Sequence, residues 1–410
     1  MNKQWRKCTL GDVLLDLKNG LNCKQDKSGL GDRISRIESV ADGLFNESRV
    51  GFAHLSETQK ERYRLRPGDI LFSHINSPPH VGKVAYFDSS EPIYHGVNLL
   101  LMRPSEQVDP RYLFYFLVNL RACGYWEKNC KKSVNQASVN QKDIRKVPFG
   151  YPICIHEQRR IVAVLDEAFA GIATATANVE KNMANVRELF DSTAEAVFTE
   201  LLECTPDQMP LETLAEGGSR LTYGVVKPGP EGEIPFVRGG DISNGRVAID
   251  KLRTITQETS DQYRRTLLKG GELLICLVGM PGQCAIASSD LAGANIARQV
   301  GLIRLTDAVI PEFVKDYLLS PAGQKSLGTH TGGSVQQVIN LGDLKKVCIP
   351  VPEKSRQAII VRQMDDLRKK CQKLEAATAQ RLAALAELKA SILRQAFSGY
   401  LSSLEKAVAA

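Results

Sequence analysis

Apolar residues recur at alternating steps of four and three along two long stretches of the chain. The first stretch runs from Glu157 to Glu203 and the second from Lys354 to Ser398, and neither contains a proline. A period of 3.5 residues held over about five heptads predicts that each stretch is one helix and that the two form a coiled coil. The apolar seam of the first helix contains Ile161, Leu165, Ile172, Val179, Val186 and Leu189. The seam of the second contains Ile360, Met364, Leu367, Leu374, Leu385, Leu388 and Ile392.

The two seams coincide when 199 is added to every residue number of the first. Each is interrupted at the same relative position by a polar residue, Asn182 in the first and Arg381 in the second. A buried polar residue can fix the register of a coiled coil. Alternatively, the seam drifts at this point and both side chains face water. Antiparallel pairing is expected, because the residues between the helices can carry the chain back.

The segments outside the two helices also repeat, at a spacing of about 200 residues. VNQKDIRKVPFGYP at 139–152 returns as INLGDLKKVCIPVP at 339–352. YRLRPGDILFS at 63–73 returns as YRRTLLKGGELLIC at 263–276. Similarity at one long period means that a single structural unit occurs twice.

In both copies, short apolar runs are separated by glycine, proline and asparagine, which is typical of short strands and turns. GDILFS and GELLIC are the best strand candidates, and PRYLFYFLVNL and PEFVKDYLLS predict short helices that begin at proline. The predicted class is α+β, with two tandem units, each a small mixed α/β domain with a twisted sheet followed by one long helix, the two helices pairing as an antiparallel coiled coil. The predicted boundaries are a first domain at 1–152, a first long helix at 153–205, a second domain at 206–352, a second long helix at 353–402 and a tail at 403–410.

Charge and cysteine content narrow the classes of function without selecting one. The first domain holds 23 Lys and Arg against 16 Asp and Glu, hence +7, whereas 206–352 holds 15 of each, hence zero. A basic surplus suits a polyanionic partner, although solvated surface Lys and Arg would give the same count. The ten cysteines form no Cys-x-x-Cys pair, so we expect reduced thiols in a cytoplasm and no zinc site. No signal peptide or membrane span is expected.

Short motifs at the ends of the domains resemble those of a known family. Residues 5–13 read WRKCTLGDV, which contains Trp5 and Leu10-Gly11-Asp12. YPICIHEQRRIV precedes the first helix, IPVPEKSRQAII leads into the second, and LKASILRQAFSG at 388–399 closes it. In this order, and with the repeated domain and helix, the whole chain resembles the specificity subunit of a type I restriction-modification system.

The resemblance implies a subunit without a catalytic centre, whose two target recognition domains each read half of a bipartite double-stranded DNA sequence. It implies two methyltransferase subunits that methylate adenine with S-adenosylmethionine, and motor-endonuclease subunits that use ATP and Mg²⁺. At ~1.5 Å per residue, each long helix would span roughly two turns of B-DNA and could set the spacing of the halves. The chain lacks an adenine-methyltransferase tetrapeptide, because NSPPH at 76–80 has an inserted serine, and it lacks a Gly-x4-Gly-Lys-Ser/Thr loop for ATP.

Side chains of the types that contact bases and phosphates occur at equivalent places in both copies. In the first copy, the candidate DNA-binding residues are Lys18, Asn19, Asn22, Lys24, Arg36, Ser73, His74, Asn76, Lys131, Lys132, Ser133, Asn135 and Gln136. In the second, they are Arg220, Thr222, Tyr223, Lys227, Arg238, Asn295, Arg298, Thr331, Ser334 and Gln336. The segments 130–141 and 329–337 are expected to be polar loops.

Several alternatives stay open at this level. Arg36 and Arg238 could contact phosphates, or form internal ion pairs with Asp42 or Asp241. His74 could contact a base or be a structural histidine. A fused methylase and nuclease is disfavoured because its motifs are missing. A coiled-coil scaffold with two partner-binding modules and no DNA readout is not excluded by the sequence.

Overall fold

The computed structural model describes residues 5–26, 28–40, 43–133, 136–205, 208–217, 221–328 and 338–398. By their internal contacts, the residues fall into two units: unit 1 is Met1–Val179 with Gln380–Ala410, and unit 2 is Glu180–Ala379. Each unit therefore combines one domain with half of each long helix, a division that differs from cutting the chain at the ends of the helices.

Unit 1 is built on a four-stranded antiparallel sheet in the order β2-β9-β5-β7. Its strands are β2 (Leu14–Asn19), β9 (Leu99–Pro104), β5 (Ile70–Ser73) and β7 (Val84–Tyr86). A smaller sheet contains β4 (Gly51–Ala53), β3 (Asp32–Ile34) and β8 (Ile93–Tyr94), of which β3 and β8 are parallel. Two further strand groups are β1 (Trp5–Thr9) with β12 (Pro148–Pro152), and β10 (Lys131–Ser133) with β11 (Gln136–Ser138) and β6 (Ile75–Asn76). The helices of this domain are α1 (Leu10–Val13), α2 (Glu57–Tyr63), α3 (Pro110–Ala122), α4 (Tyr125–Asn129) and α5 (Gln141–Arg145).

Unit 2 repeats the main sheet, the smaller sheet and the antiparallel pair that corresponds to β1 with β12. Its main sheet has the order β14-β22-β19-β20, with β14 (Thr222–Tyr223), β22 (Val300–Ile303), β19 (Leu273–Cys276) and β20 (Cys284–Ile286). Its smaller sheet contains β18 (Arg253–Ile255), β15 (Ile234–Val237) and β21 (Asn295–Ile296), and again includes one parallel pair. The other strand pairs are β13 (Gln208–Pro210) with β23 (Cys348–Pro350), and β16 (Ile242–Ser243) with β17 (Arg246–Val247). The helices are α7 (Gln257–Gln262), α8 (Pro311–Leu319), α9 (Pro321–Gly328) and α10 (Leu341–Lys346). The predicted α+β class and its repeat are confirmed.

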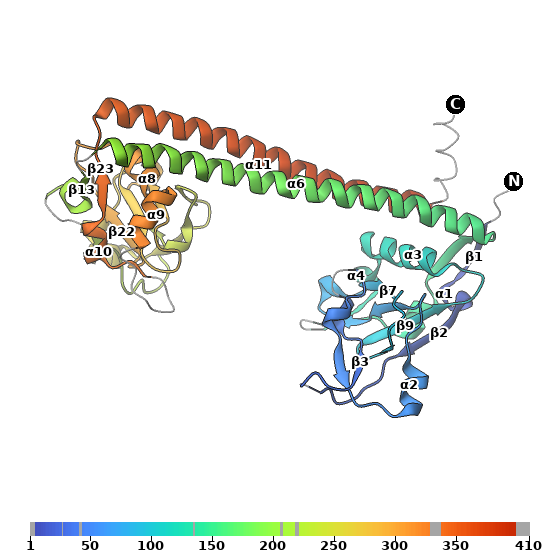
Figure 1. Cartoon of the computed structure of the whole chain (residues 1–410). Coiled ribbons are helices and arrows are strands. Elements are labelled where there is room, and N and C mark those ends of the chain that lie inside the picture. The colour runs from blue at the N-terminus through green and yellow to red at the C-terminus, as the bar shows by residue number, and fades with distance from the viewer. Residues whose placement is uncertain are drawn as a thin grey trace, which may run out of the picture. The chain divides into compact units, whose positions relative to one another are not determined.

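The two long helices are α6 (Ile155–Cys204) and α11 (Lys354–Phe397). In each unit they lie side by side (Figure 1). In unit 2, Arg187 of α6 pairs with Glu375, and Glu200, further along α6, pairs with Arg356, earlier in α11. Residue numbers that rise on one helix and fall on the other mean that the pairing is antiparallel, as predicted.

The predicted seam holds at most of its positions and fails at three. Ile172, Val179, Val186, Leu367, Leu385 and Ile392 are partly buried. Ile161, Leu165, Ile360 and Met364 are buried. Three other predicted seam residues are largely exposed: Leu189 at 53%, Leu374 at 50% and Leu388 at 48%.

A drift of the helix explains these errors. A straight α-helix drifts by about 20° per heptad against a 3.5-residue repeat. After three heptads, the residue that directly follows a predicted seam position therefore faces the partner helix in its place. Met183 and Phe190 are accordingly partly buried in α6, as is Leu382 in α11. Asn182 and Arg381 are exposed, so the alternative in which both face water is correct.

A buried glutamine holds each domain to the start of its long helix. Gln158 donates through Nε2 to the carbonyls of Gln107 and Pro152, at 2.9 Å each, and accepts the Asp109 N–H through Oε1 at 2.8 Å. Gln357, 199 residues later, makes the same three contacts with Ala308, Pro352 and Ile310. Both side chains are fully buried. The repeat therefore preserves the contact that fixes each domain on its helix.

Among the described residues, α6 is the one helix that is long and apolar enough to cross a membrane, with a mean hydropathy of 1.2 over its best window. The expectation that no such segment exists is wrong by this measure. Ile161, Leu165 and Phe198 of α6 nevertheless lie in the cores of the two units, and the core helix of a folded domain passes the same test.

Candidate nucleic-acid interface

In unit 1, three strands of the main sheet end or begin at one edge. The pairing of Asn19 with Leu100 and of Ser73 with Leu99 aligns the end of β2 and the end of β5 with the start of β9. Asn22 lies three residues after the end of β2, and His74 directly follows β5. The sheet therefore gathers at one edge polar residues that lie more than 50 positions apart in the chain, and we call this the polar edge of unit 1.

The predicted polar loop at 130–141 is mostly a hairpin, which extends the polar edge. Strands β10 and β11 pair with each other, and β11 pairs with β6 through Ala137 and Asn76. Lys131, Lys132 and Ser133 are exposed on β10, as is Gln136 on β11. The structure thus brings two predicted groups together, the one that follows β5 and the one in the hairpin. Asn135 lies outside the described residues.

A close backbone approach fixes the segment that follows β2. A Cβ atom added at Gly20 would lie 1.8 Å from the Gly96 carbonyl oxygen, and one added at Gly224 in unit 2 would lie 1.8 Å from that of Ile296. Next to these glycines, the Leu21 N–H donates to the His95 carbonyl and the Val225 N–H to that of Ile296, at 2.9 and 2.8 Å. Only glycine fits at either position, so both candidate recognition segments leave the sheet in the same way.

Two histidines of unit 1 occupy positions that are aliphatic in unit 2. His95 is fully buried, and its Nε2 lies 3.1 Å from the Leu99 carbonyl oxygen, to which it can donate. Burial lowers the pKa of His95 to about 3, and the charges of Lys18 and His74 contribute in the same direction. Burial also lowers the pKa of the partly exposed His74. Backbone contacts align His95 with Ile296 and His74 with Leu277. Both imidazoles are therefore neutral near pH 7 and add no positive charge to the polar edge.

The corresponding edge of unit 2 presents different side chains. The Arg298 N–H donates to the Val225 carbonyl and the Leu277 N–H donates to the Gln299 carbonyl, so Arg298 lies two residues before β22, between the two neighbouring segments. Arg298, Lys227 and Tyr223 are exposed, Tyr223 to 44%, and Thr222 is partly buried. The remaining candidates of this domain, Arg220, Thr331, Ser334 and Gln336, lie outside the described residues.

The structure argues against two of the predicted DNA contacts. Asn295 is fully buried in unit 2, where its side chain accepts a hydrogen bond from Thr266 at 2.6 Å and donates to Ser260 at 3.4 Å. Ser73 is also buried, and its hydroxyl accepts a hydrogen bond from Asn76. Ser73 is the last residue of β5 and Asn295 is the first residue of β21. Sequence matching could not show that their side chains turn into the interior.

The two matching arginines differ in their partners. Arg238 forms a two-pronged ion pair with Asp241, at 2.9 and 3.1 Å, so the internal alternative holds. Arg36 pairs instead with Glu38 at 3.2 Å, on the surface, while Asp42 lies outside the described residues. Lys24, Asn19 and Asn22 are exposed.

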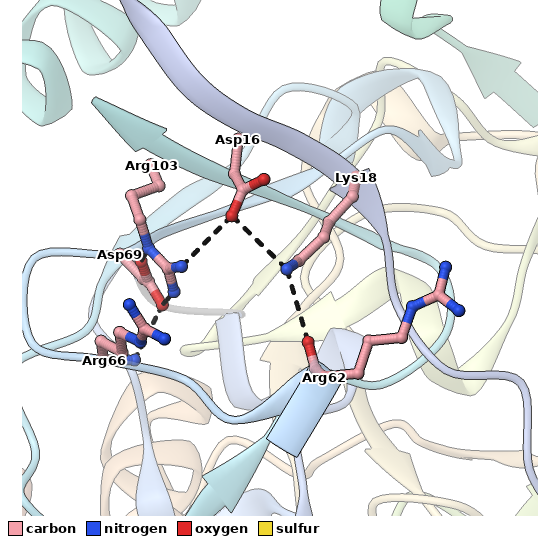
Figure 2. A network of polar contacts seen from close by, with 6 residues as sticks. All are labelled: Asp16, Lys18, Arg62, Arg66, Asp69 and Arg103. Carbon is pink, nitrogen blue, oxygen red and sulfur yellow. Dashed lines mark hydrogen bonds and ion pairs between the residues drawn. The ribbon is translucent and has the colours of Figure 1, made fainter. Parts of the chain in front are cut away.

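Lys18 belongs to a network of charged groups at the side of the main sheet (Figure 2). Its ammonium lies 3.5 Å from Asp16 and 3.4 Å from the Arg62 carbonyl oxygen. Arg103 binds the buried Asp69 with two contacts of 2.7 Å and reaches Asp16 at 3.2 Å. Sequence analysis overlooked the neighbouring segment, although its arginines at every second position from 62 to 66 were a visible signal.

No group of three metal-binding side chains occurs among the described residues. All ten cysteines are free thiols, and Cys276, Cys284 and Cys371 are buried. The buried polar groups named above are held by hydrogen bonds and ion pairs within each domain. What both domains expose is a polar edge suited to contact with a ligand.

Comparison with known proteins agrees with this picture. The family described as "Type I restriction modification DNA specificity domain" matches residues 2–181 and 216–384. The putative type I restriction enzyme MjaX specificity subunit of Methanocaldococcus jannaschii is 30% identical over 392 residues, which cover 89% of this chain and 88% of that protein. The EcoBI specificity subunit of Escherichia coli is 33% identical over 186 residues, 45% of this chain and 39% of that protein.

Solved structures share the fold. A chain described under "Structural basis underlying complex assembly and conformational transition of the type I R-M system" has a TM-score of 0.73 and 18% identity, over 97% of this chain and 98% of its own. The HsdS subunit from Thermoanaerobacter tengcongensis has a TM-score of 0.52 and 18% identity, over 97% of both chains.

Proposed function

This chain belongs to the family of type I restriction-modification DNA specificity subunits, and we propose that each of its domains reads one half of a split double-stranded DNA target. It is a recognition subunit and not an enzyme, and DNA, methyltransferase and motor-endonuclease subunits are the partners that membership implies. The observation that supports two-part reading is the repeat of one topology with the same backbone crossing at Gly20 and Gly224.

The two halves of the target should differ in sequence, because the two edges differ in chemistry. The edge of unit 1 carries asparagine, lysine and glutamine side chains, which suit hydrogen bonds to base edges in the major groove. The edge of unit 2 carries Tyr223, Lys227 and Arg298, of which the arginine suits guanine. The long helices, of 50 and 44 residues, would set the gap between the halves.

The outward faces of the long helices suit the methyltransferase subunits. Arg187 and Asp191 of α6 line a cavity against α8, and at about 100° per residue Leu189 lies about 160° away from both. Leu388 lies about 180° around α11 from Phe397, which packs on Tyr112 of the first domain. Leu189 and Leu388 are equivalent by the 199-residue repeat, and both are half exposed. Two equivalent apolar positions, one in each unit, favour two copies of the methyltransferase.

The chemistry of the complex would belong to these partners. S-adenosylmethionine would be bound by the methyltransferase, and ATP and Mg²⁺ by the motor-endonuclease. The chain would act in the cytoplasm of a bacterial or archaeal cell, where its substrate DNA lies.

The test is a map of methylated adenines. The chain is expressed with its methyltransferase in a host without adenine methylation, and all modified positions are sequenced. A split motif with an unspecified gap is expected, and replacing residues 206–350 by another recognition domain should change one half alone. Modification that does not depend on this chain would favour the scaffold alternative.

A further inference from the structure

A basic segment leads into the central strand of each domain. In unit 1 it contains Arg62, Arg64 and Arg66 before β5, and in unit 2 it contains Arg265 and Lys269 before β19. We call these five residues the entry cations. All five side chains are exposed, and none forms an ion pair with another described residue. Each segment therefore presents positive charge that its own domain does not neutralise.

The last cation of each segment is anchored by the same contact. The Arg66 N–H donates to the Asp69 carboxylate at 2.8 Å, and the Lys269 N–H donates to the Glu272 carboxylate at 2.7 Å. Both carboxylates are buried, and each forms an ion pair with an arginine of its own domain, Asp69 with Arg103 and Glu272 with Arg304. The carboxylate therefore fixes the backbone of the segment, while its charge is balanced by the inner arginine. The outer cation keeps its charge for a partner.

The segment of unit 1 begins beside the polar edge. Lys18, which lies one residue before Asn19, contacts the Arg62 carbonyl oxygen. Figure 2 shows the Arg62 side chain extending away from this network, and its guanidinium lies 5.6 Å from the centre of the Tyr63 ring. A ligand bound at the polar edge would therefore have Arg62 beside it, whereas Arg66 is held with Asp69 and Arg103 near Asp16, towards the other end of the same strands.

We propose that the entry cations of both domains hold the DNA backbone by contacts with phosphates and not with bases. The proposal rests on the proposed function and names residues for it. Phosphates are alike in every sequence, so such contacts set affinity and register without selecting bases. The second domain especially needs them, since its 15 Lys and Arg are balanced by 15 Asp and Glu. A local cluster can supply the attraction that a neutral domain as a whole does not.

The experiment measures how the affinity of the assembled complex for DNA depends on salt. The full chain is purified with its methyltransferase, and the Kd for a duplex carrying the mapped motif is measured at several salt concentrations. Two variants are compared with the wild type: Arg62→Gln/Arg64→Gln/Arg66→Gln and Arg265→Gln/Lys269→Gln. Each lost phosphate contact should lower the slope of log K against log salt by about 0.9, hence by about 2.7 and about 1.8. The methylated motif should stay the same.

A matched control removes charge elsewhere. Lys142 and Lys146 are exposed at helix α5, and Lys142→Gln/Lys146→Gln should leave the slope unchanged. If the control lowers the slope as much as the variants do, net charge is responsible and the proposal is wrong. It is also wrong if the variants keep the wild-type slope, if they change the motif, or if they no longer copurify with the methyltransferase. A wild-type complex that methylates no split motif would contradict the proposed function itself, and this proposal with it.

Discussion

Acid should destabilise the first domain through His95. The folded state holds this imidazole with a pKa of about 3, against 6.5 when it is free. Between these values the unfolded chain binds a proton that the folded domain does not, so stability is lost as the pH falls below 6.5. At pH 5, about 1.5 pH units below the free value, the loss should be about 2 kcal/mol. His74, whose pKa is also lowered, acts in the same direction.

The chain provides its own probe and its own control. Both tryptophans, Trp5 and Trp126, belong to unit 1, so urea unfolding followed by tryptophan fluorescence reports on this unit. The wild type should lose about 2 kcal/mol or somewhat more between pH 7 and pH 5. His95→Ile introduces the residue that unit 2 has at this position, and should remove most of the loss. An equal loss in wild type and variant would refute the reasoning, because the protons would then bind elsewhere.

Three further predictions follow from contacts that the repeat preserves. Gln158→Ala leaves three buried backbone groups without a partner and should cost the first domain about 3 kcal/mol by the same fluorescence assay, while Gln357→Ala should leave that curve nearly unchanged. Gly224→Ala should abolish methylation at the split motif, because the added Cβ displaces the segment that carries Tyr223, and circular dichroism should still show a folded protein. Leu189→Glu or Leu388→Glu should each reduce the complex from two methyltransferase copies to one, as measured by native mass spectrometry; loss of both copies from either variant would contradict separate docking faces.

Comparison of the two halves of the sequence could predict the long helices and the main strands, because these elements occur in both copies. Apolar spacing predicted α6 and α11, and glycine turns predicted β5 and β19, since both signals depend on local backbone geometry. The exact seam was not predictable by a strict heptad, because helix drift accumulates with distance, and Leu189 and Leu388 consequently turn outward. Asn295 shows a second limit. Its residue type suits base contact, but its burial depends on Thr266 and Ser260, which are distant in sequence.

The two domains share their interior ion pair and differ at the edges that are expected to contact the two half-sites. The buried carboxylate and its arginine recur as Asp69 with Arg103 and as Glu272 with Arg304. At the candidate reading edges, by contrast, Asn19 stands against Tyr223 and Lys18 against Thr222, so charge and hydrogen-bonding groups change while the strands beneath them keep their pairing.

This separation has a consequence for exchanging domains. The side chains that fix each domain to its helix are interior and alike in both copies, as Gln158 and Gln357 show. A transplanted domain that brings its own terminal strand pair, equivalent to β1 with β12, and its own glutamine should therefore stay fixed to the long helix. This should hold whichever residues it carries at its polar edge. Edge residues can then vary without a cost in stability, since exposed substitutions usually change it by less than about 0.5 kcal/mol. New half-site specificity is thus expected to arise by replacing whole domains or edge residues, with the helices left unaltered.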